Sequence, residues 1–220
     1  MSLEDLLGIE RPIIQAPMAG SQGSALAIAV ANAGGLGSLP CAMLTPDSIR
    51  AELASIRAQT RGPINVNFFC HTPPVPDAER EARWRAVLAT YYEEHGIRAD
   101  RIQAGPGRAP FTAAAADVLR EFEPAVVSFH FGLPSEDLMN RVRSWGAKFI
   151  SSATTVAEAR WLAARGVDAV IAQGFEAGGH RGMFIETDVA AWFEKYYSIR
   201  FRNYSVPLEY LHDREEIACV

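Results

Sequence analysis

Short apolar runs alternate with helical segments along most of this 220-residue chain, and this alternation limits the folds open to it. Each run has five or six residues, a length typical of buried strands. The runs predict strands at residues 12–17, 35–39, 64–69, 125–129, 148–152 and 169–173. Helices are predicted between them, at residues 24–32, 46–60, 77–94, 111–122, 135–145 and 156–165. Strands that alternate with helices form βαβ units, so the chain is predicted to contain a parallel sheet.

Two α/β architectures satisfy this pattern, an open doubly wound sheet and a closed (β/α)8 barrel. Polar residues lie at the carboxyl ends of several predicted strands, namely Gln15, Asn67, His130 and Gln173. Barrel enzymes build their sites from several strand ends, whereas an open sheet uses one switch point. The pattern therefore favours a TIM (β/α)8-type barrel. Six strands are fewer than a barrel requires, so we expect an incomplete one of about six βα units.

The composition argues against nucleic-acid and membrane partners. The formal net charge is −5, and no stripe of basic residues is visible. No apolar stretch approaches the ~20 residues that cross a bilayer, and the N-terminal segment lacks the basic start of a signal peptide. The three cysteines, Cys41, Cys70 and Cys219, match neither a disulfide framework nor a zinc spacing. We therefore expect a cytoplasmic protein with no metal site.

The segment that follows the last predicted strand is the strongest candidate for a functional site. Gly178 and Gly179 precede His180, and glycines let a backbone approach an anion or a flat ring closely. A histidine titrates near pH ~6.5 and is suited to moving protons. The alternative is a strand-to-helix turn that carries a surface histidine.

Two inner strands carry further polar candidates. Asn65 and Asn67 share one face of their predicted strand, as do Ser128 and His130 on the next. An amide that faces a barrel interior needs a partner, which a flavin edge or the neighbouring backbone could supply. His130 is either a core residue or part of a site. The other three histidines, His71, His95 and His212, are predicted to be solvated.

Taken together, five motifs resemble those of the FMN-dependent nitronate monooxygenases, formerly called 2-nitropropane dioxygenases. They occur in order at residues 15–20 (QAPMAG), 33–37 (AGGLG), 65–67 (NVN), 128–132 (SFHFG) and 173–180 (QGFEAGGH). The resemblance covers about residues 8–191. It implies a TIM barrel with FMN across the strand ends, and oxidation of alkyl nitronates by O2 to a carbonyl compound and nitrite.

The resemblance also implies roles for individual residues. His180 would be the catalytic base or would orient the substrate, and His130 would help to hold its nitro oxygens. Asn67 and Gln173 would hydrogen-bond the FMN. The remaining positions would line the flavin or approach it by backbone: Gln15, Ala16, Pro17, Met18, Gly178 and Gly179.

After residue 191 the chain departs from this pattern. We expect an FMN-binding partial barrel over residues 1–191 and a divergent tail over 192–220, in which no strand–glycine–helix pattern appears. The tail would either patch a shortened barrel or pair with a second copy in a homo-oligomer. FMN affinity should be weakened, because a barrel's phosphate site usually follows strands 7 and 8. The alternatives are an FMN-dependent NAD(P)H reductase of the enoyl-ACP or quinone reductase type, and an inactive remnant.

Overall fold

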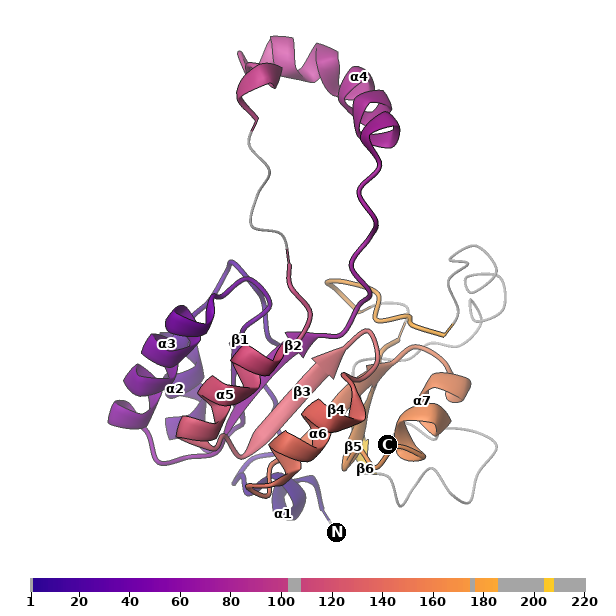
Figure 1. The fold of residues 1–220 in the computed structure, drawn as a ribbon. Helices are drawn as coiled ribbons and strands as arrows, with labels where there is room; N and C mark the ends of the chain where they lie inside the picture. Colours follow the sequence, from indigo (N-terminus) through magenta and orange to yellow (C-terminus); the bar gives the residue numbers. More distant parts are fainter. Residues whose placement is uncertain (1, 103–107, 175–176, 186–203, 208–220) are drawn as a thin grey trace.

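The computed structural model describes residues 2–102, 108–174, 177–185 and 204–207. A six-stranded sheet forms its centre, with the strands in the order β1-β2-β3-β4-β5-β6 (Figure 1). The strands are β1 (Gly37–Pro40), β2 (Ile64–Phe69), β3 (Val126–His130), β4 (Lys148–Ala153), β5 (Ala169–Ala172) and β6 (Tyr204–Pro207). β1 to β5 are parallel, and β6 pairs antiparallel with β5.

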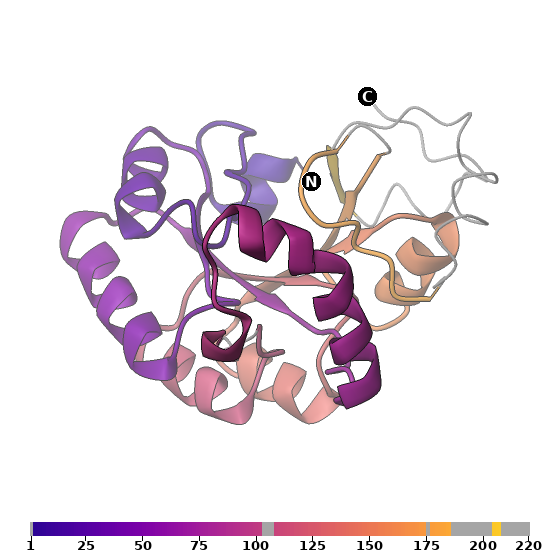
Figure 2. The ribbon, with the colours of Figure 1, turned by 90° about the horizontal axis from the view of Figure 1, so that it is seen from above.

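Five helices form an arc along one face of the sheet, which Figure 2 shows from above. They are α2 (Ser24–Asn32), α3 (Pro46–Gln59), α5 (Ala113–Phe122), α6 (Glu136–Arg143) and α7 (Val156–Ala163). Threonine N-caps begin three of them, since the hydroxyls of Thr45, Thr112 and Thr155 accept backbone N–H groups of the first turn. Alternate strand residues, such as Phe68 and Phe129, pack beneath these helices in the main core.

The opposite face of the sheet carries an apolar cluster beside α1 and a set of buried polar side chains. Val126 and Ile150 belong to one buried cluster with Leu7 of α1 (Leu3–Leu7), a helix that the sequence did not predict. The buried polar side chains are Ser38, Asn65, Asn67, Ser128 and Ser152; in the strand register, Asn65 lies beside Val126 and Ser128 beside Ile150. Helix α1 thus packs against the apolar part of this face.

The first predicted strand, residues 12–17, is not formed. Only one bridge is present, between Ile14 and Leu36. Pro12 and Pro17 cannot donate to a strand ladder, which explains why pairing stops there. The Gln15 side chain takes over instead: its Nε2 donates to the Ser38 carbonyl and its Oε1 accepts from the Ser38 N–H, each at 3.1 Å. The sheet therefore has five parallel strands in place of the six expected.

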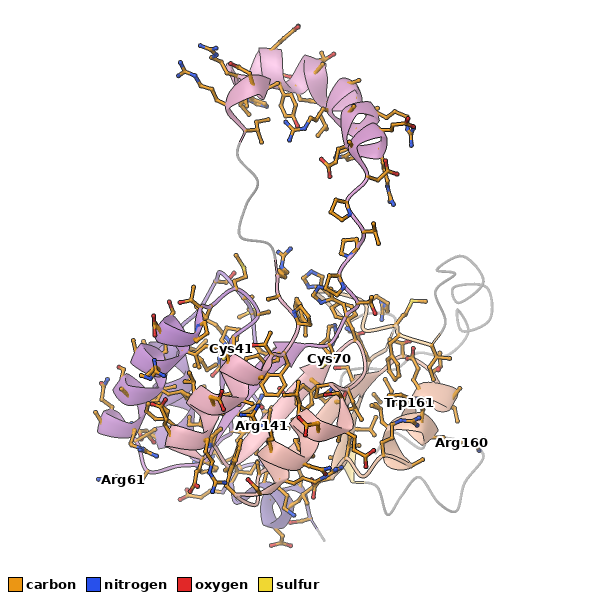
Figure 3. All side chains as sticks on the ribbon, viewed as in Figure 1. Cys41, Arg61, Cys70, Arg141, Arg160 and Trp161 are labelled. Carbon is orange, nitrogen blue, oxygen red and sulfur yellow. The ribbon has the colours of Figure 1, made fainter. Side chains whose placement is uncertain are left out.

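A long arm separates β2 from β3 and carries α4 (Ala78–Glu94) and the short helix η1 (Ala99–Arg101). Figure 1 shows α4 standing away from the sheet, beyond the carboxyl ends of the strands. No side chain of α4 is buried. The arm leaves the sheet at Cys70, labelled in Figure 3, and returns at Pro110, which forms a bridge with Phe69.

No helix in the part of the chain that the structure describes is long and apolar enough to cross a membrane. β6 lies within the segment that was expected to be a divergent tail, and the sequence did not predict it. It covers the edge of β5 through four paired positions.

Candidate active site

The carboxyl ends of β2, β3 and β5 bring the predicted site residues together. Phe69 and His130 are register partners at the ends of β2 and β3, and Gln173 directly follows β5. Residues 177–185 pass this end of the sheet. Nε2 of His130 lies 3.1 Å from the carbonyl oxygen of His180. The two histidines predicted from the sequence are therefore adjacent.

Gln173 holds the loop with both ends of its side-chain amide. Its Nε2 donates to the His180 carbonyl, and its Oε1 accepts from the Gly182 N–H, each at 2.7 Å. The Gln173 backbone N–H donates to the Ala153 carbonyl at 2.9 Å, which fixes the residue against β4. A contact of Gln173 with flavin stays a prediction, and the second hydrogen on Nε2 is the group that could make it.

The hydrogen bond between the histidines defines the protonation of His130. A carbonyl oxygen only accepts, so Nε2 of His130 carries a proton and Nδ1 is the acceptor of the neutral ring. Burial lowers the pKa of His130 below its ordinary value of 6.5, and the bond to the His180 carbonyl opposes this only in part. His130 is therefore neutral at pH 7. Its expected contact with the substrate's nitro oxygens stays a prediction.

Two phenylalanine rings pack against both histidines. The Phe69 centroid lies 5.9 Å from that of His130 and 5.4 Å from that of His180. The corresponding distances for Phe131 are 4.4 Å and 6.0 Å. Phe131 has a φ of 66°, a left-handed conformation that costs a non-glycine residue about 1–3 kcal/mol. This strained backbone places an aromatic ring against two imidazoles.

A third histidine belongs to the same cluster, and the prediction that it is solvated is wrong. The His71 ring centroid lies 6.2 Å from those of Phe69 and Phe131. Its Nδ1 is buried and has no hydrogen-bond partner among the described residues. Phe131 directly follows the neighbouring strand β3, so adjacent sequence could not reveal this contact. His95 is exposed, and His212 lies outside the described residues.

The His180 ring is exposed above this cluster. Within the described part of the chain, its imidazole nitrogens form no hydrogen bond, so both are available to a ligand. Gly178 and Gly179 precede it and are also exposed. Gly179 has a φ of 78°, which a side chain rarely adopts, and no atom lies within 4 Å of where a Cβ at either glycine would be.

The amides of β2 lie on the inner face, as predicted. Asn67 Nδ2 donates to Ser128 Oγ at 2.9 Å, and Asn65 Nδ2 donates to Ser38 Oγ at 3.0 Å. The Oδ1 atom of Asn65 is buried, and no described residue pairs with it. An unpaired buried acceptor of this kind is the atom that a bound donor would satisfy.

The loop predicted to line a flavin lies at the same end of the sheet, next to β1. Its backbone is braced by Gln22, whose Nε2 donates to the Ala16 carbonyl at 3.0 Å. Pro17 is half-buried and Met18 is exposed. Gln15 is occupied by Ser38, as described above, so its flavin contact also stays a prediction.

Sequence reasoning missed Glu158, whose side chain is completely buried on α7. Its carboxylate accepts from backbone groups on both sides of the site, including the N–H of Phe184 at 2.7 Å. The spacing of Thr155 and Glu158 is that of a capping box, which was a usable signal.

Metal binding and cysteine chemistry find little support among the described residues. Within the described ranges, no three His, Cys, Asp or Glu side chains cluster so as to hold a metal ion. Burial raises the pKa of the Cys41 and Cys70 thiols far above the ordinary value, so neither is a ready nucleophile.

Known proteins resemble this chain in sequence. The family model for nitronate monooxygenase matches residues 1–195. The nitronate monooxygenase of Paraburkholderia phytofirmans is 46% identical over 190 residues, which are 83% of this chain and 50% of the relative. That of Pseudomonas aeruginosa is 44% identical over 183 residues, covering 81% of this chain and 51% of the relative.

Solved structures agree in fold. The nitroalkane oxidase of Streptomyces ansochromogenes superposes with a TM-score of 0.70 and 40% identity, over 84% of this chain and 52% of that one. FabK from Thermotoga maritima gives a TM-score of 0.58 and 28% identity, over 83% and 46%. The predicted incomplete TIM-type barrel is thereby confirmed. This chain spans about half the length of the relatives it matches. The chain belongs to the nitronate monooxygenase family.

Proposed function

We propose that this protein binds FMN and oxidises alkyl nitronates with O2 to a carbonyl compound and nitrite. The observation that carries the proposal is the position of His180. Its ring is open to a ligand, while its own carbonyl is held by Gln173 and His130 at the strand ends. Family membership supports the reaction class, and the geometry supports His180 as the residue that would meet the substrate.

His180 would either accept a proton from the substrate or hold the negative charge of an ionised nitronate. A neutral imidazole there accepts the proton α to a nitro group, whereas the imidazolium holds a nitronate that is already ionised. Both roles need the ring at the same place, and the two hydrogen bonds to its carbonyl fix the backbone from which the ring extends. The faces of Phe69 and Phe131 offer apolar contact for a small alkyl group.

The residues of this site fit a flavin. The open space above Gly178 and Gly179 lets a flat ring or a phosphate approach the backbone. The unpaired Oδ1 of Asn65 supports a bound donor on the same inner face, where Asn67 would also contact the cofactor. When bound, FMN supplies the electron transfer between the nitronate and O2.

The setting proposed for this activity is the cytoplasm, with no nucleic-acid or membrane partner. This assignment rests on the acidic net charge and on the free Cys41 and Cys70. Assembly into a homo-oligomer stays a prediction, which light scattering of the purified protein would check.

The decisive experiment uses the purified 220-residue chain incubated with FMN. A visible flavin spectrum after removal of free cofactor, with nitrite release and O2 uptake from propionate 3-nitronate, would support the proposal. NAD(P)H oxidation without nitrite release would identify the reductase alternative. Absence of bound flavin at saturating FMN would contradict the proposal and favour the inactive remnant.

A further inference from the structure

Glu158 is a buried acid with no place in the chemistry proposed above. Its exposed fraction is 0%, and each of its two carboxylate oxygens accepts two hydrogen bonds. Oε2 accepts from the N–H and the hydroxyl of Thr154, at 2.7 and 2.8 Å. Oε1 accepts from the N–H groups of Phe184 and Ile185, at 2.7 and 3.1 Å.

These bonds join two segments that are distant in sequence. Thr154 lies in the turn between β4 and α7, whereas Phe184 and Ile185 follow the loop that carries His180. The Gln173 amide holds this loop at the His180 carbonyl and the Gly182 N–H. Glu158 holds it two residues further on. In the described part of the chain, the His180 loop is therefore held by the side chains of Gln173 and Glu158, and by that of His130 through its bond to the His180 carbonyl.

The Phe184 ring carries this constraint toward β3. It packs against Trp161 of α7, labelled in Figure 3, with 5.1 Å between ring centroids. On its other side it approaches the backbone of Gly132 so closely that a Cβ there would lie 3.3 Å from the ring. Gly132 follows His130 and Phe131, so the residue that Glu158 fixes packs against the segment that comes directly after the neutral histidine.

A carboxylate is the group this position requires. Backbone N–H groups are donors, and an ionised carboxylate is the side chain that only accepts, with two oxygens. A glutamine of the same shape would aim an NH2 group at donors on one side. Burying a charge is costly unless it is hydrogen-bonded, and here four bonds meet it.

We infer that Glu158 is a positioning residue, which sets the place of His180 relative to His130 by holding the Phe184 and Ile185 amides. The expected effect of Glu158 on turnover rests on the proposed function, whereas its hydrogen bonding to the His180 loop does not. Glu158 acts at a distance from the reacting atoms and is therefore not a catalytic residue.

The test compares Glu158→Gln with Glu52→Gln in the full chain. Glu52 is a matched control, because its half-buried carboxylate also accepts a distant backbone N–H, that of Ser24, at 2.9 Å. Residue-resolved amide exchange should speed up by at least about tenfold at Phe184 and Ile185 in Glu158→Gln, and stay unchanged there in Glu52→Gln. With FMN bound to equal stoichiometry, kcat should fall by about tenfold or more in Glu158→Gln alone, with a smaller change in KM.

Unchanged exchange at both amides in Glu158→Gln would overturn the inference, as would an equal loss of kcat in the Glu52→Gln control. If Glu158→Gln does not fold, the wild-type chain decides. The amide hydrogens of Phe184 and Ile185 must then exchange at least about tenfold more slowly than that of Gly179. Equal rates would refute the inference that Glu158 holds these two amides. If wild-type protein releases no nitrite, the proposed function fails, while the exchange result still judges the role of Glu158.

Discussion

The backbone of Gly182 lies directly against the imidazole ring of His130. A Cβ at Gly182 would stand 2.7 Å from Cε1 and 3.1 Å from Nδ1 of that ring. The contact closes the acceptor side of the ring, while Nε2 on the other side bonds the His180 carbonyl. His130 is thus held between two points of one loop.

Gly182→Ala should displace either His130 or the loop. The new methyl group would overlap the ring, and it also meets Gln173 Oε1 at 3.3 Å. We expect kcat/KM for nitrite release to fall by about tenfold or more, because a shift of this size misplaces a reacting group. The melting temperature should fall as well, since overpacking costs about 1–3 kcal/mol. Wild-type kinetics in this variant would show that the ring moves at no cost to the site.

Gly178→Ala should leave the stability of the flavin-free protein unchanged, since no atom lies within 4 Å of the new methyl group. If the backbone at this position contacts FMN, the Kd for the cofactor should rise by about tenfold. Fluorescence quenching of FMN on binding gives the Kd, and a thermal melt without cofactor gives the stability. An unchanged Kd would remove Gly178 from the cofactor contacts.

His180→Asn should abolish turnover of nitroalkane substrates while the protein still binds FMN, because the ring would be lost and the carbonyl contacts would remain. The expected loss in kcat is about a hundredfold or more, as for removal of a general base. His95→Asn is the control, since His95 is exposed at the end of α4. Nitrite release by flavin-loaded His180→Asn at the control's rate would exclude the residue from the reaction.

The stability of the fold should decrease as pH falls below 6.5, in part because of His130. Burial lowers its pKa in the folded state, so below pH 6.5 the unfolded chain binds a proton that the folded chain does not. The loss begins near the ordinary value and levels off once the pH passes below the folded-state pKa. Thermal melts between pH 8 and 5 should show a shallower decline for His130→Gln than for wild type. Parallel curves would contradict this assignment.

Helices and strands were predicted correctly where the local pattern of apolar and polar residues determines them. The helix at residues 24–32 and the strand at 64–69 have the predicted bounds. The apolar content of residues 12–17 predicted a strand, but only one bridge forms there, because proline cannot donate to a strand ladder. β6 could not be predicted, since its partner β5 lies more than 30 residues away and tertiary pairing decides such strands.

The candidate site was predictable as a set of residues but not as a set of contacts. His130 and His180 were found from their places after strands, and the structure joins them by a hydrogen bond. The bond uses the backbone oxygen of His180, which no side-chain pattern encodes. The His71 contact with Phe131 and the Glu158 contact with Phe184 also cross between elements. Only the folded geometry reveals which groups already have partners.

The arm that carries α4 begins and ends at neighbouring points of the backbone. Phe69 forms a bridge with Pro110 and accepts a hydrogen bond from the Phe111 N–H at 2.8 Å. The two ends are thus fastened together, and no side chain of α4 is buried. We therefore expect the sheet to tolerate substitutions in α4 and changes in the length of this insertion. Evolution can remodel what stands over the site through this segment and leave the histidine-bearing strands intact.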